Sequence, residues 1–557
     1  MKIKSICAVI LCIAVLLSGC GSAGIKGSTN ASENQSVQSQ IKEEAEKEAK
    51  GEISVACSIT DSFNPYNAKT PLNRNLSTLL YEPLIALDES FTPQYRLASK
   101  ITLKGKTATV TLRTASFSDG SSVTAEDVVY CAEKAMDSKT RFSDSLADVS
   151  SVSASSYDTV VFTLKKEDPY FINQLDFPIF KRNSDKKTSS DNLEIPPISS
   201  GAYTVDDTKL KLNINKYYYG KKPTVKTVNL INTPDGEALE HNLQIGNVSY
   251  HYSDLSDCKL LQVRGNYKKV NSNNLVFLGT NMASGLMSKV DMRQAVSAAL
   301  DREAISNTAY YQNAVPTSNA FHPDWAKGNN ITAINQNTIN ENVYLALLDE
   351  IGYNTKDKSG YYKNSAGERL SLTLVCYKEN AWRLAAADLI KKQLKVAGID
   401  VNIQRYSWND YTNAIKNGHF DMYLAEVCIG NNMDIGELVT KGGSAAYGIS
   451  YSNKQDSSNA SSVDNASSAD TTSVAVNTSS EPKKEEKKDP AGDTAKAVSE
   501  MYKGDATITE VATAFLGEMP IIPICYRTGM VSYALGISGI TTSITDVYGG
   551  IRNAKIK

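Results

Sequence analysis

An alternation of strand-like and helix-like patterns between residues 370 and 427 constrains the fold more tightly than any other part of the sequence. Apolar stretches predict strands at 370–376, 401–406 and 421–427, and helical periodicity predicts helices at 382–396 and 408–417 between them. Alternation of this kind forms a parallel sheet with right-handed crossovers. The sequence therefore predicts an α/β fold.

Two shorter patterns extend this mixed content toward the N-terminus. Residues 107–113 alternate apolar and polar side chains, which predicts a half-buried strand. Thr124 and Asp127 resemble a capping box at the start of a helix. The dipeptide Asp119-Gly120 is typical of a turn, so we interpret Asp119 as turn chemistry and not as a catalytic acid.

The first twenty residues are typical of a secretory signal. Lys2 and Lys4 precede an apolar run at 6–17, which is shorter than the roughly 20 residues that span a bilayer, so a permanent anchor helix is the weaker alternative. Leu17-Ser18-Gly19-Cys20 resembles a bacterial lipobox. The resemblance implies removal of the signal peptide 1–19 and acylation of Cys20, palmitate included. We expect residues 20–50 to form a lipid-anchored flexible tether on the extracytoplasmic face of the cell membrane.

The overall composition favours ligand recognition. The 59 Lys and Arg residues are balanced by 61 Asp and Glu, so the formal net charge is −2 and no basic field exists to attract nucleic acid. A mean hydropathy of −0.31 argues against a polytopic membrane protein. The 29 tyrosines, against 12 phenylalanines, favour aromatic surfaces that stack on a ligand and keep a hydroxyl for hydrogen bonding.

One segment differs in composition from the rest of the chain. Residues 452–500 contain no Leu, Ile, Phe, Tyr or Trp and therefore cannot build a core. We interpret 452–497 as a disordered insertion that splits a domain without unfolding it, although the sequence from Asp493 onward is compatible with a helix. A partner-docking arm is the alternative.

Six cysteines follow the tether, and none forms a C-x-x-C pair, which argues against zinc ribbons and thioredoxin-like sites. We favour mostly buried free thiols. Cys376 and Cys428 each follow a predicted strand of the alternating unit and form the pair to test first for a disulfide. The six are Cys57, Cys131, Cys258, Cys376, Cys428 and Cys525.

Short motifs follow one another in a fixed order at 79–84, 117–128, 201–203, 215–223, 292–302, 397–401 and 519–523. The apolar side chains of 292–300 fall on one helical face, which predicts core packing. In this order the motifs resemble the bacterial extracellular solute-binding proteins of family 5, which include the oligopeptide-, dipeptide- and nickel-binding proteins of ABC transporters. Each motif is weak alone, but their order over roughly 450 residues behind a lipoprotein signal is specific.

The resemblance implies a periplasmic-binding-protein-like fold of type II, cluster C, with two lobes built from three domains with mixed sheets and a ligand cleft between the lobes. Crossovers near Val276 and Pro520 would act as the hinge on which the lobes close over ligand. The implied domains are a discontinuous domain I at 51–72, 195–276 and 521–557, domain II at 73–194, and domain III at 277–520, which carries the insertion.

Candidate ligand-binding residues come from the loops that follow the strands of the alternating unit, where parallel sheets bind their ligands. Peptide binders of the family hold the free amino terminus with an acid after the strand that corresponds to 421–427. Here that position falls near Gly430, so Glu426 and Asp434 are the substitutes and Asn431 lies between them. Trp408 matches a family position where an aromatic side chain lines the pocket. The remaining candidates, from strand ends and a glycine-rich segment, are Tyr377, Trp382 and Tyr447.

The expected function is that of an ABC importer's substrate-binding lipoprotein. It would capture a peptide or peptide-like solute by hinge closure, deliver it to the permease and ATPase subunits, and act as a monomer without a cofactor, a metal or catalysis. A ligand-sensing lipoprotein without transport is one alternative, and a secreted hydrolase is another. The sequence contains neither H-E-x-x-H nor G-x-S-x-G, and a metal site at His241 or His251 fits no standard spacing.

Overall fold

The computed structural model describes residues 52–188, 194–331, 336–451 and 492–557. The predicted signal peptide, Cys20 and the tether lie outside the described residues. None of the helices in the described part of the chain combines the length and the apolar character that crossing a bilayer requires.

The alternating unit between residues 370 and 428 forms the parallel part of a mixed sheet. Strand β16 pairs in parallel with β17 on one side and with β18 on the other. Helices α10 (Ala381–Val396) and α11 (Trp408–Lys416) connect them, and Gly398 ends the first connection with a positive φ of 82°. The prediction of a parallel strand–helix unit is therefore confirmed. The three strands are β16 (Ser371–Tyr377), β17 (Asp400–Tyr406) and β18 (Met422–Cys428).

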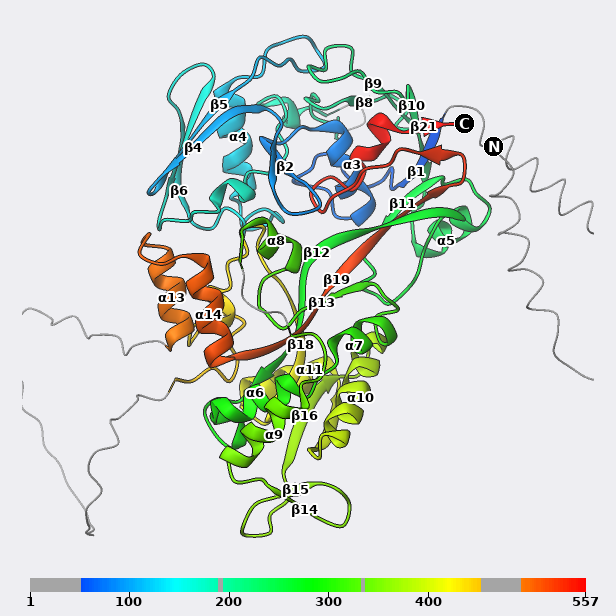
Figure 1. The fold of residues 1–557 in the computed structure, drawn as a ribbon. Helices are drawn as coiled ribbons and strands as arrows, with labels where there is room; N and C mark the ends of the chain where they lie inside the picture. The colour runs from blue at the N-terminus through cyan, green and yellow to red at the C-terminus, as the bar shows by residue number, and fades with distance from the viewer. Residues whose placement is uncertain (1–51, 189–193, 332–335, 452–491) are drawn as a thin grey trace, which may run out of the picture. The chain divides into compact units, whose positions relative to one another are not determined.

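Two long antiparallel strands extend this sheet, and Figure 1 shows them side by side. β12 (Gly265–Thr280) pairs with β18 and with β19 (Ile521–Ala534), which also pairs with β11 (Tyr250–Ser253) and β13 (Ala314–Pro316). The pairing of β12 with β19 shifts register between Asn271 and Leu275 and again between Val276 and Phe277. The sequence position predicted as a hinge thus falls at irregular strand pairing.

Two four-stranded sheets precede this one in the chain. The first joins β1 and β10 in parallel, followed by β9 and β8; the second has the order β4-β5-β7-β6. β5 (Thr107–Leu112) confirms the half-buried strand predicted there, and α4 (Ala125–Ala135) begins with the Thr124–Asp127 capping box. The other strands are β1 (Ile53–Cys57), β10 (Thr227–Asn232), β9 (Lys211–Ile214), β8 (Tyr203–Val205), β4 (Ala98–Lys104), β7 (Thr159–Leu164) and β6 (Val149–Ala154).

Short elements complete the described fold. The two-stranded pairs are β2 (Ile85–Leu87) with β3 (Pro93–Tyr95), β14 (Thr355–Lys356) with β15 (Tyr362–Lys363), and β20 (Ile537–Ser538) with β21 (Lys555–Ile556). Further α-helices are α3 (Pro71–Leu80), α5 (Gly236–Gln244), α6 (Val290–Ala298), α7 (Arg302–Thr308), α8 (Pro323–Gly328), α9 (Glu341–Glu350), α12 (Gly436–Val439), α13 (Asp493–Met501) and α14 (Ile508–Glu518). Single 3₁₀ turns lie at Phe171–Gln174, Ser184–Lys186, Leu286–Ser288 and Gly549–Asn553.

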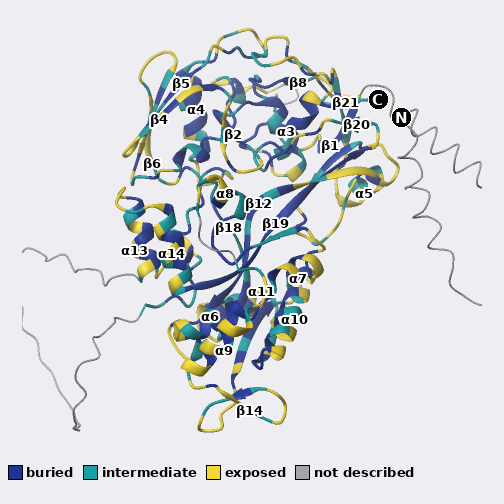
Figure 2. Cartoon of the chain, viewed as in Figure 1, coloured by how far each residue is buried: buried dark blue, intermediate teal, exposed yellow. Residues whose placement is uncertain are grey.

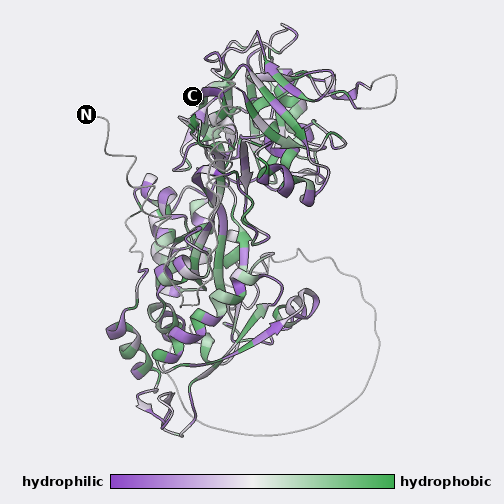
Figure 3. Cartoon of the chain, turned by 90° about the vertical axis from the view of Figure 1, so that its right-hand side faces the viewer, coloured by the Kyte–Doolittle hydropathy of each residue, from purple (hydrophilic) through white to green (hydrophobic). Residues whose placement is uncertain are grey.

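The core follows β19, which is buried throughout, and the C-terminal half of β12, which Figure 2 colours mostly as buried. Figure 3 shows hydrophobic stretches among hydrophilic ones along the strands. The apolar face predicted within 292–300 is buried as expected. Two arginines of the same motif, Arg293 and Arg302, are also buried, because their guanidinium groups satisfy main-chain carbonyls. Arg293 donates to the oxygens of Glu518 and Met519, and Arg302 donates to that of Pro523.

The predicted disordered insertion 452–497 extends too far at its C-terminal end. Residues from Asp493 onward form α13, in which Ala495, Ala497 and Val498 are buried, since small side chains still pack against α12 and α14. Residues 452–491 lie outside the described residues. Tyr451 and Gly492, which flank them, lie so close that a Cβ at 492 would collide with the Tyr451 ring.

The six cysteines that follow the tether are free thiols. Four of them are buried, as expected, whereas Cys258 is half-buried and Cys428 is exposed. The candidate disulfide between Cys376 and Cys428 does not form, because β16 and β18 pair with Cys376 opposite Leu424 and Cys428 lies four residues further along its strand.

Candidate functional site

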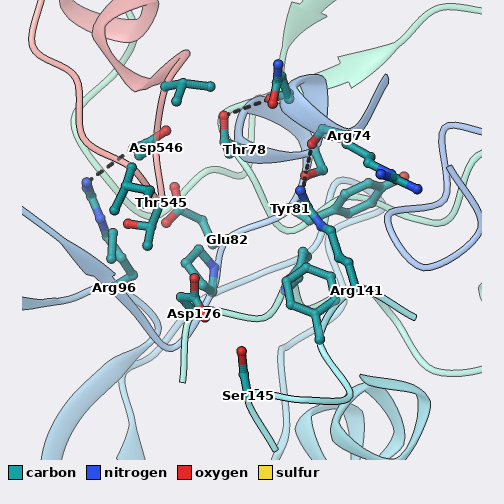
Figure 4. Close-up of a pocket in the computed structure, with 18 of the residues that line it drawn as sticks. Arg74, Thr78, Tyr81, Glu82, Arg96, Arg141, Ser145, Asp176, Thr545 and Asp546 are labelled. Carbon is teal, nitrogen blue, oxygen red and sulfur yellow. Dashed lines mark hydrogen bonds and ion pairs between the residues drawn. The ribbon is translucent and has the colours of Figure 1, made fainter. Parts of the chain in front are cut away.

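A cavity of about 200 Å³ lies between α3, the segment 141–145 and the C-terminal segment 544–552 (Figure 4). One part of its wall is a closed ion network. Arg552 contacts Asp546 and lies 3.7 Å from Glu82, and Arg96 lies 3.5 Å from Asp546. These four charged groups neutralise one another and leave little charge available for a ligand.

Two other arginines on the wall have no carboxylate partner. Arg74, on α3, donates through Nε to the carbonyl of Ala68 at 3.0 Å. Arg141 lies over the Phe142 ring, 4.6 Å from its centroid, and its Nη2 is 3.5 Å from the Ser77 hydroxyl. Among the described residues, no Asp or Glu oxygen lies within 4.0 Å of either guanidinium group. The cavity therefore holds uncompensated positive charge.

Arg141 is exposed because the cavity reaches its side chain, yet the surrounding protein still perturbs it. Removal from bulk water lowers the pKa of Arg141 to about 10, although nearby Asp176 acts in the opposite direction. A second cavity of about 540 Å³ shares Arg74, Asn75 and Arg141 with the first. Its volume lies within the roughly 300–1,000 Å³ typical of small-molecule sites.

The wall of this second cavity also carries acidic residues. They are Asp235, which caps the N-terminus of α5, and Asp254 and Asp257, which follow β11. Positive charge at the shared arginines and negative charge on these acids make the combined space bipolar. Such a space suits a ligand that carries both signs of charge.

The loop after β18, where the resemblance places the acid, carries amide side chains at the key positions. Asn431 Nδ2 donates to Asp176 at 3.1 Å, and Asn432 Nδ2 donates to Asp168 at 2.8 Å. Asp434 accepts from Lys166 Nζ at 3.3 Å. The structure therefore places Asn431 and Asp434 against residues 166–176, and Asp176 itself lines the first cavity.

Glu426, predicted to contact the ligand, has two internal counter-ions. Its Oε1 lies 2.6 Å from Arg527 on β19, and its Oε2 lies 3.1 Å from Arg383 on α10. Arg527 Nη1 also donates to the carbonyl of Asp254 at 2.8 Å. Only 10% of the Glu426 side chain is exposed, so its carboxylate is saturated by protein partners.

The predicted aromatic residues lie on separate parts of the surface and core. Trp408 is 54% exposed, packs edge-on to Tyr377 at 5.4 Å and stacks on Tyr411 at 5.8 Å. Trp382 is buried against Tyr310. Tyr447 is half-buried, and its carbonyl accepts from the Tyr423 hydroxyl at 3.4 Å. The structure brings Trp408 and Tyr377 together, but neither cavity is lined by these four aromatic residues.

Sequence reasoning missed Arg74, Arg141 and Asp176. They are isolated charged residues in unrelated segments, and only the tertiary fold brings them together. Within the described ranges, no cluster of three His, Cys, Asp or Glu residues could hold a metal ion. His251 is buried on β11, and burial lowers its pKa to about 4.

Comparisons with known proteins identify relatives of this chain. Residues 90–446 match the family model described as bacterial extracellular solute-binding proteins, family 5 middle. The chain is 26% identical over 443 residues to the oligopeptide-binding protein AppA of Bacillus subtilis, covering 74% of this chain and 78% of that protein. It is 24% identical to the dipeptide-binding protein of Escherichia coli, covering 47% of this chain and 49% of that protein.

Two solved structures show the same fold. The unliganded open form of the periplasmic murein tripeptide-binding protein MppA superposes with a TM-score of 0.68 at 19% identity, over 91% of this chain and 97% of that one. NikA of Brucella suis in complex with Fe(III)-EDTA gives a TM-score of 0.63 at 16% identity, over 91% of this chain and all of that one.

Proposed function

The chain belongs to the bacterial extracellular solute-binding proteins of family 5, and on this premise we propose that it is the extracytoplasmic substrate-binding lipoprotein of an ABC importer. It captures a peptide or peptide-like solute and delivers it chemically intact to a permease. The B. subtilis and E. coli relatives, which bind oligopeptides and dipeptides, support peptide cargo. Acylated Cys20 and the tether hold the body at the cell membrane.

The observation that carries the proposal is the pair of guanidinium groups without a carboxylate partner, Arg74 and Arg141, on the wall that both cavities share. Guanidinium groups bind carboxylates through paired, charge-assisted hydrogen bonds. A solute carboxylate would supply the counter-ion that Arg74 and Arg141 lack at contact distance. It would also stabilise the charged form of Arg141, whose pKa the surrounding protein lowers, so its binding has a clear electrostatic rationale.

Movement of the lobes would use the two long strands. Both cavities are lined by residues of the proposed domains I and II, and domain III would meet the first of them where Asn431 donates to Asp176. β12 and β19 pass between the part of the sheet near β11 and the parallel part near β18, and their pairing is irregular at residues 271–277. Irregular pairing concentrates backbone adjustment in a few residues, which favours bending there. The domain boundaries at 72, 194, 276 and 520 are proposed from the family resemblance, and the irregular pairing supports only the one at 276.

The proposal is tested by calorimetry on residues 21–557, which avoid the lipid anchor. Solutes that co-purify are identified by mass spectrometry, and alanine peptides of two to five residues are titrated in parallel. We expect binding that weakens roughly 10- to 100-fold on R74Q or R141Q, because each loses charge-assisted bonds. Arg264→Gln, at an exposed arginine outside both cavities, is the matched control.

A metal chelate is the competing cargo, because chelators with several carboxylates would use the same two guanidinium groups and the NikA structure holds Fe(III)-EDTA. Titration with Fe(III)-EDTA and with the nickel–histidine complex separates the two classes. Binding of chelates without peptides would replace the peptide proposal. Absence of any solute, together with unaltered cavity variants, would overturn the import function.

A further inference from the structure

Asp176 is an acidic residue whose position on the cavity wall is unusual. It follows the 3₁₀ turn Phe171–Gln174 and is half-buried on the wall of the first cavity. Its side chain accepts a hydrogen bond from Asn431, in the loop after β18, whose Nδ2 donates to Oδ2 at 3.1 Å. One oxygen of the Asp176 carboxylate therefore accepts a hydrogen bond from a neutral amide, and the carboxylate borders the cavity.

No positive charge compensates this carboxylate at contact distance. Among the residues that the structure describes, no Lys, Arg or His nitrogen lies within 4.0 Å of it. Burial raises the pKa of Asp176 to about 6, and Arg141 opposes the shift only from a longer distance. The other acids of the same wall differ, because Glu82 and Asp546 are both paired with Arg552.

We propose that Asp176 is the counter-ion of an ammonium group on the bound solute, so that the cavity takes a zwitterion whose carboxylate reaches Arg74 and Arg141. This inference rests on the proposed function and specifies the class of its substrate. An ammonium group supplies three donors and one positive charge, which match a carboxylate that has free lone pairs and no cation. The amino end of a short peptide has this chemistry.

The arrangement also explains why residues 430–432 of the loop after β18 include no acid, although Asp434 follows them and pairs with Lys166. A carboxylate at Gly430, Asn431 or Asn432 would stand beside Asp176 and Asp168, and like charges at such distances repel. The amides of Asn431 and Asn432 instead donate to these acids at 3.1 and 2.8 Å. Both charges that the zwitterion requires therefore come from the segment 74–176, and the facing loop contributes neutral donors.

Asp168 offers a matched control for Asp176. Asp168 is buried where Asp176 is half-buried, and like Asp176 it has a pKa raised to about 6 by burial and accepts an amide hydrogen bond from the same loop. It also accepts from the backbone N–H of Tyr170 at 2.9 Å, and it does not line the first cavity. The variants D176N and D168N thus both neutralise a carboxylate held by an amide of this loop, and only D176N changes the charge that a solute in this cavity would meet.

The experiment titrates each protein with alanine peptides of two to five residues in three forms: free, N-acetylated and C-terminally amidated. Wild type and D168N should bind the free peptide roughly 10- to 100-fold more tightly than the N-acetylated one, because acetylation removes the ammonium charge. In D176N this difference should disappear. The amidated form should weaken binding in all three proteins, since it removes the contact to Arg74 and Arg141.

A pH series gives a second readout. Because the empty site holds Asp176 partly protonated below about pH 6, binding of an ammonium must release that proton, and affinity for the free peptide should fall about tenfold between pH 7.5 and pH 5. The charged groups that share the wall are Arg74, Glu82, Arg96, Arg141, Asp546 and Arg552, and Asp168 faces the neighbouring loop residue. D176N should lose this pH dependence, and D168N should keep it.

The outcomes separate the inference from the function on which it rests. Equal affinity for free and N-acetylated peptides in wild type, or an unchanged preference in D176N, would overturn the role of Asp176 while peptide binding stands. Failure of every peptide form to bind any of the proteins would overturn both.

Discussion

Replacing Glu426 with glutamine tests whether this carboxylate is an internal counter-ion or a ligand contact. It stands between Arg527 and Arg383, at 2.6 and 3.1 Å, and the exposed fractions of the three side chains are 10%, 5% and 18%. The cluster joins β18, β19 and the first turn of α10, and Arg527 also holds the carbonyl of Asp254. Glutamine keeps the shape and removes the charge.

The expected loss follows from the burial of the two arginines. With the carboxylate present the cluster carries one net positive charge, whereas E426Q leaves two guanidinium groups facing each other without a counter-ion. Breaking a buried ion pair by removing one partner costs about 3–5 kcal/mol. We therefore expect the free energy of unfolding to fall by about that amount, and the double variant E426Q/R383Q to recover part of the loss because it removes one of the repelling charges.

Denaturant unfolding monitored by tryptophan fluorescence measures this effect, because Trp382 and Trp408 lie at the N-terminal ends of α10 and α11 in the same unit. The control is E437Q, at an exposed acid that accepts a backbone hydrogen bond from Ser444 without an ion pair. It should change stability by less than about 1 kcal/mol. Unchanged stability of E426Q together with lost affinity for an ammonium-bearing peptide would refute the reasoning and make Glu426 the ligand acid that the sequence suggested.

Three further outcomes are expected. Arg302→Met should lower the free energy of unfolding by about 3 kcal/mol or more, because the carbonyls of Pro523, Ser297 and Gln336 lose their hydrogen-bond donor in a fully buried site. The stability of R302K should lie between those of R302M and wild type, and an R302M variant as stable as wild type would contradict this. Burial lowers the pKa of His251 and His322 to about 4, so the unfolded state gains protons first and stability should fall by up to about 3 kcal/mol per histidine as pH drops from about 6.5 to 4. The raised pKa values of Asp168 and Asp176 act in the opposite direction, so the comparison of H322N with wild type at pH 7 and pH 4.5 isolates the histidine, and an unchanged acid slope in H322N would count against its role. Alkylation of the native protein should modify Cys258 and Cys428 before the buried thiols. Burial raises the pKa of two of those buried thiols, Cys57 to about 12 and Cys376 to about 11, and so lowers their reactivity. Recovery of a peptide with a Cys376–Cys428 disulfide would refute the register of β16 and β18.

The parallel unit was predictable from sequence because its signals are local. β16 and β18 are rich in apolar residues, β17 alternates apolar and polar ones, and the connecting helices have their own periodicity. Gly398 ends the first connection in the left-handed conformation that glycine favours. The capping box at Thr124 is equally local. Such features depend on residues a few positions apart, and tertiary contacts add to them without changing them.

The cavity was not predictable, because its charged residues acquire meaning only through distant neighbours. Arg74 and Arg552 are both single arginines in sequence, yet one has no ion-pair partner and the other is held by Glu82 and Asp546. The position of Glu426 near a strand end suggested a ligand contact, but it could not indicate the ion pairs that the structure shows with two arginines from other segments. Ion pairs between distant segments cannot be predicted from the spacing or the periodicity of residues in the sequence.

The contact between Tyr451 and Gly492 has a practical consequence for protein engineering. Because Tyr451 and Gly492 lie next to each other, and the Tyr451 hydroxyl donates to the Val439 carbonyl at 2.5 Å, a short glycine–serine linker can replace residues 452–491 without pulling α12 and α13 apart. The same junction can accept a fluorescent protein, which would turn the receptor into a genetically encoded reporter of its own solute.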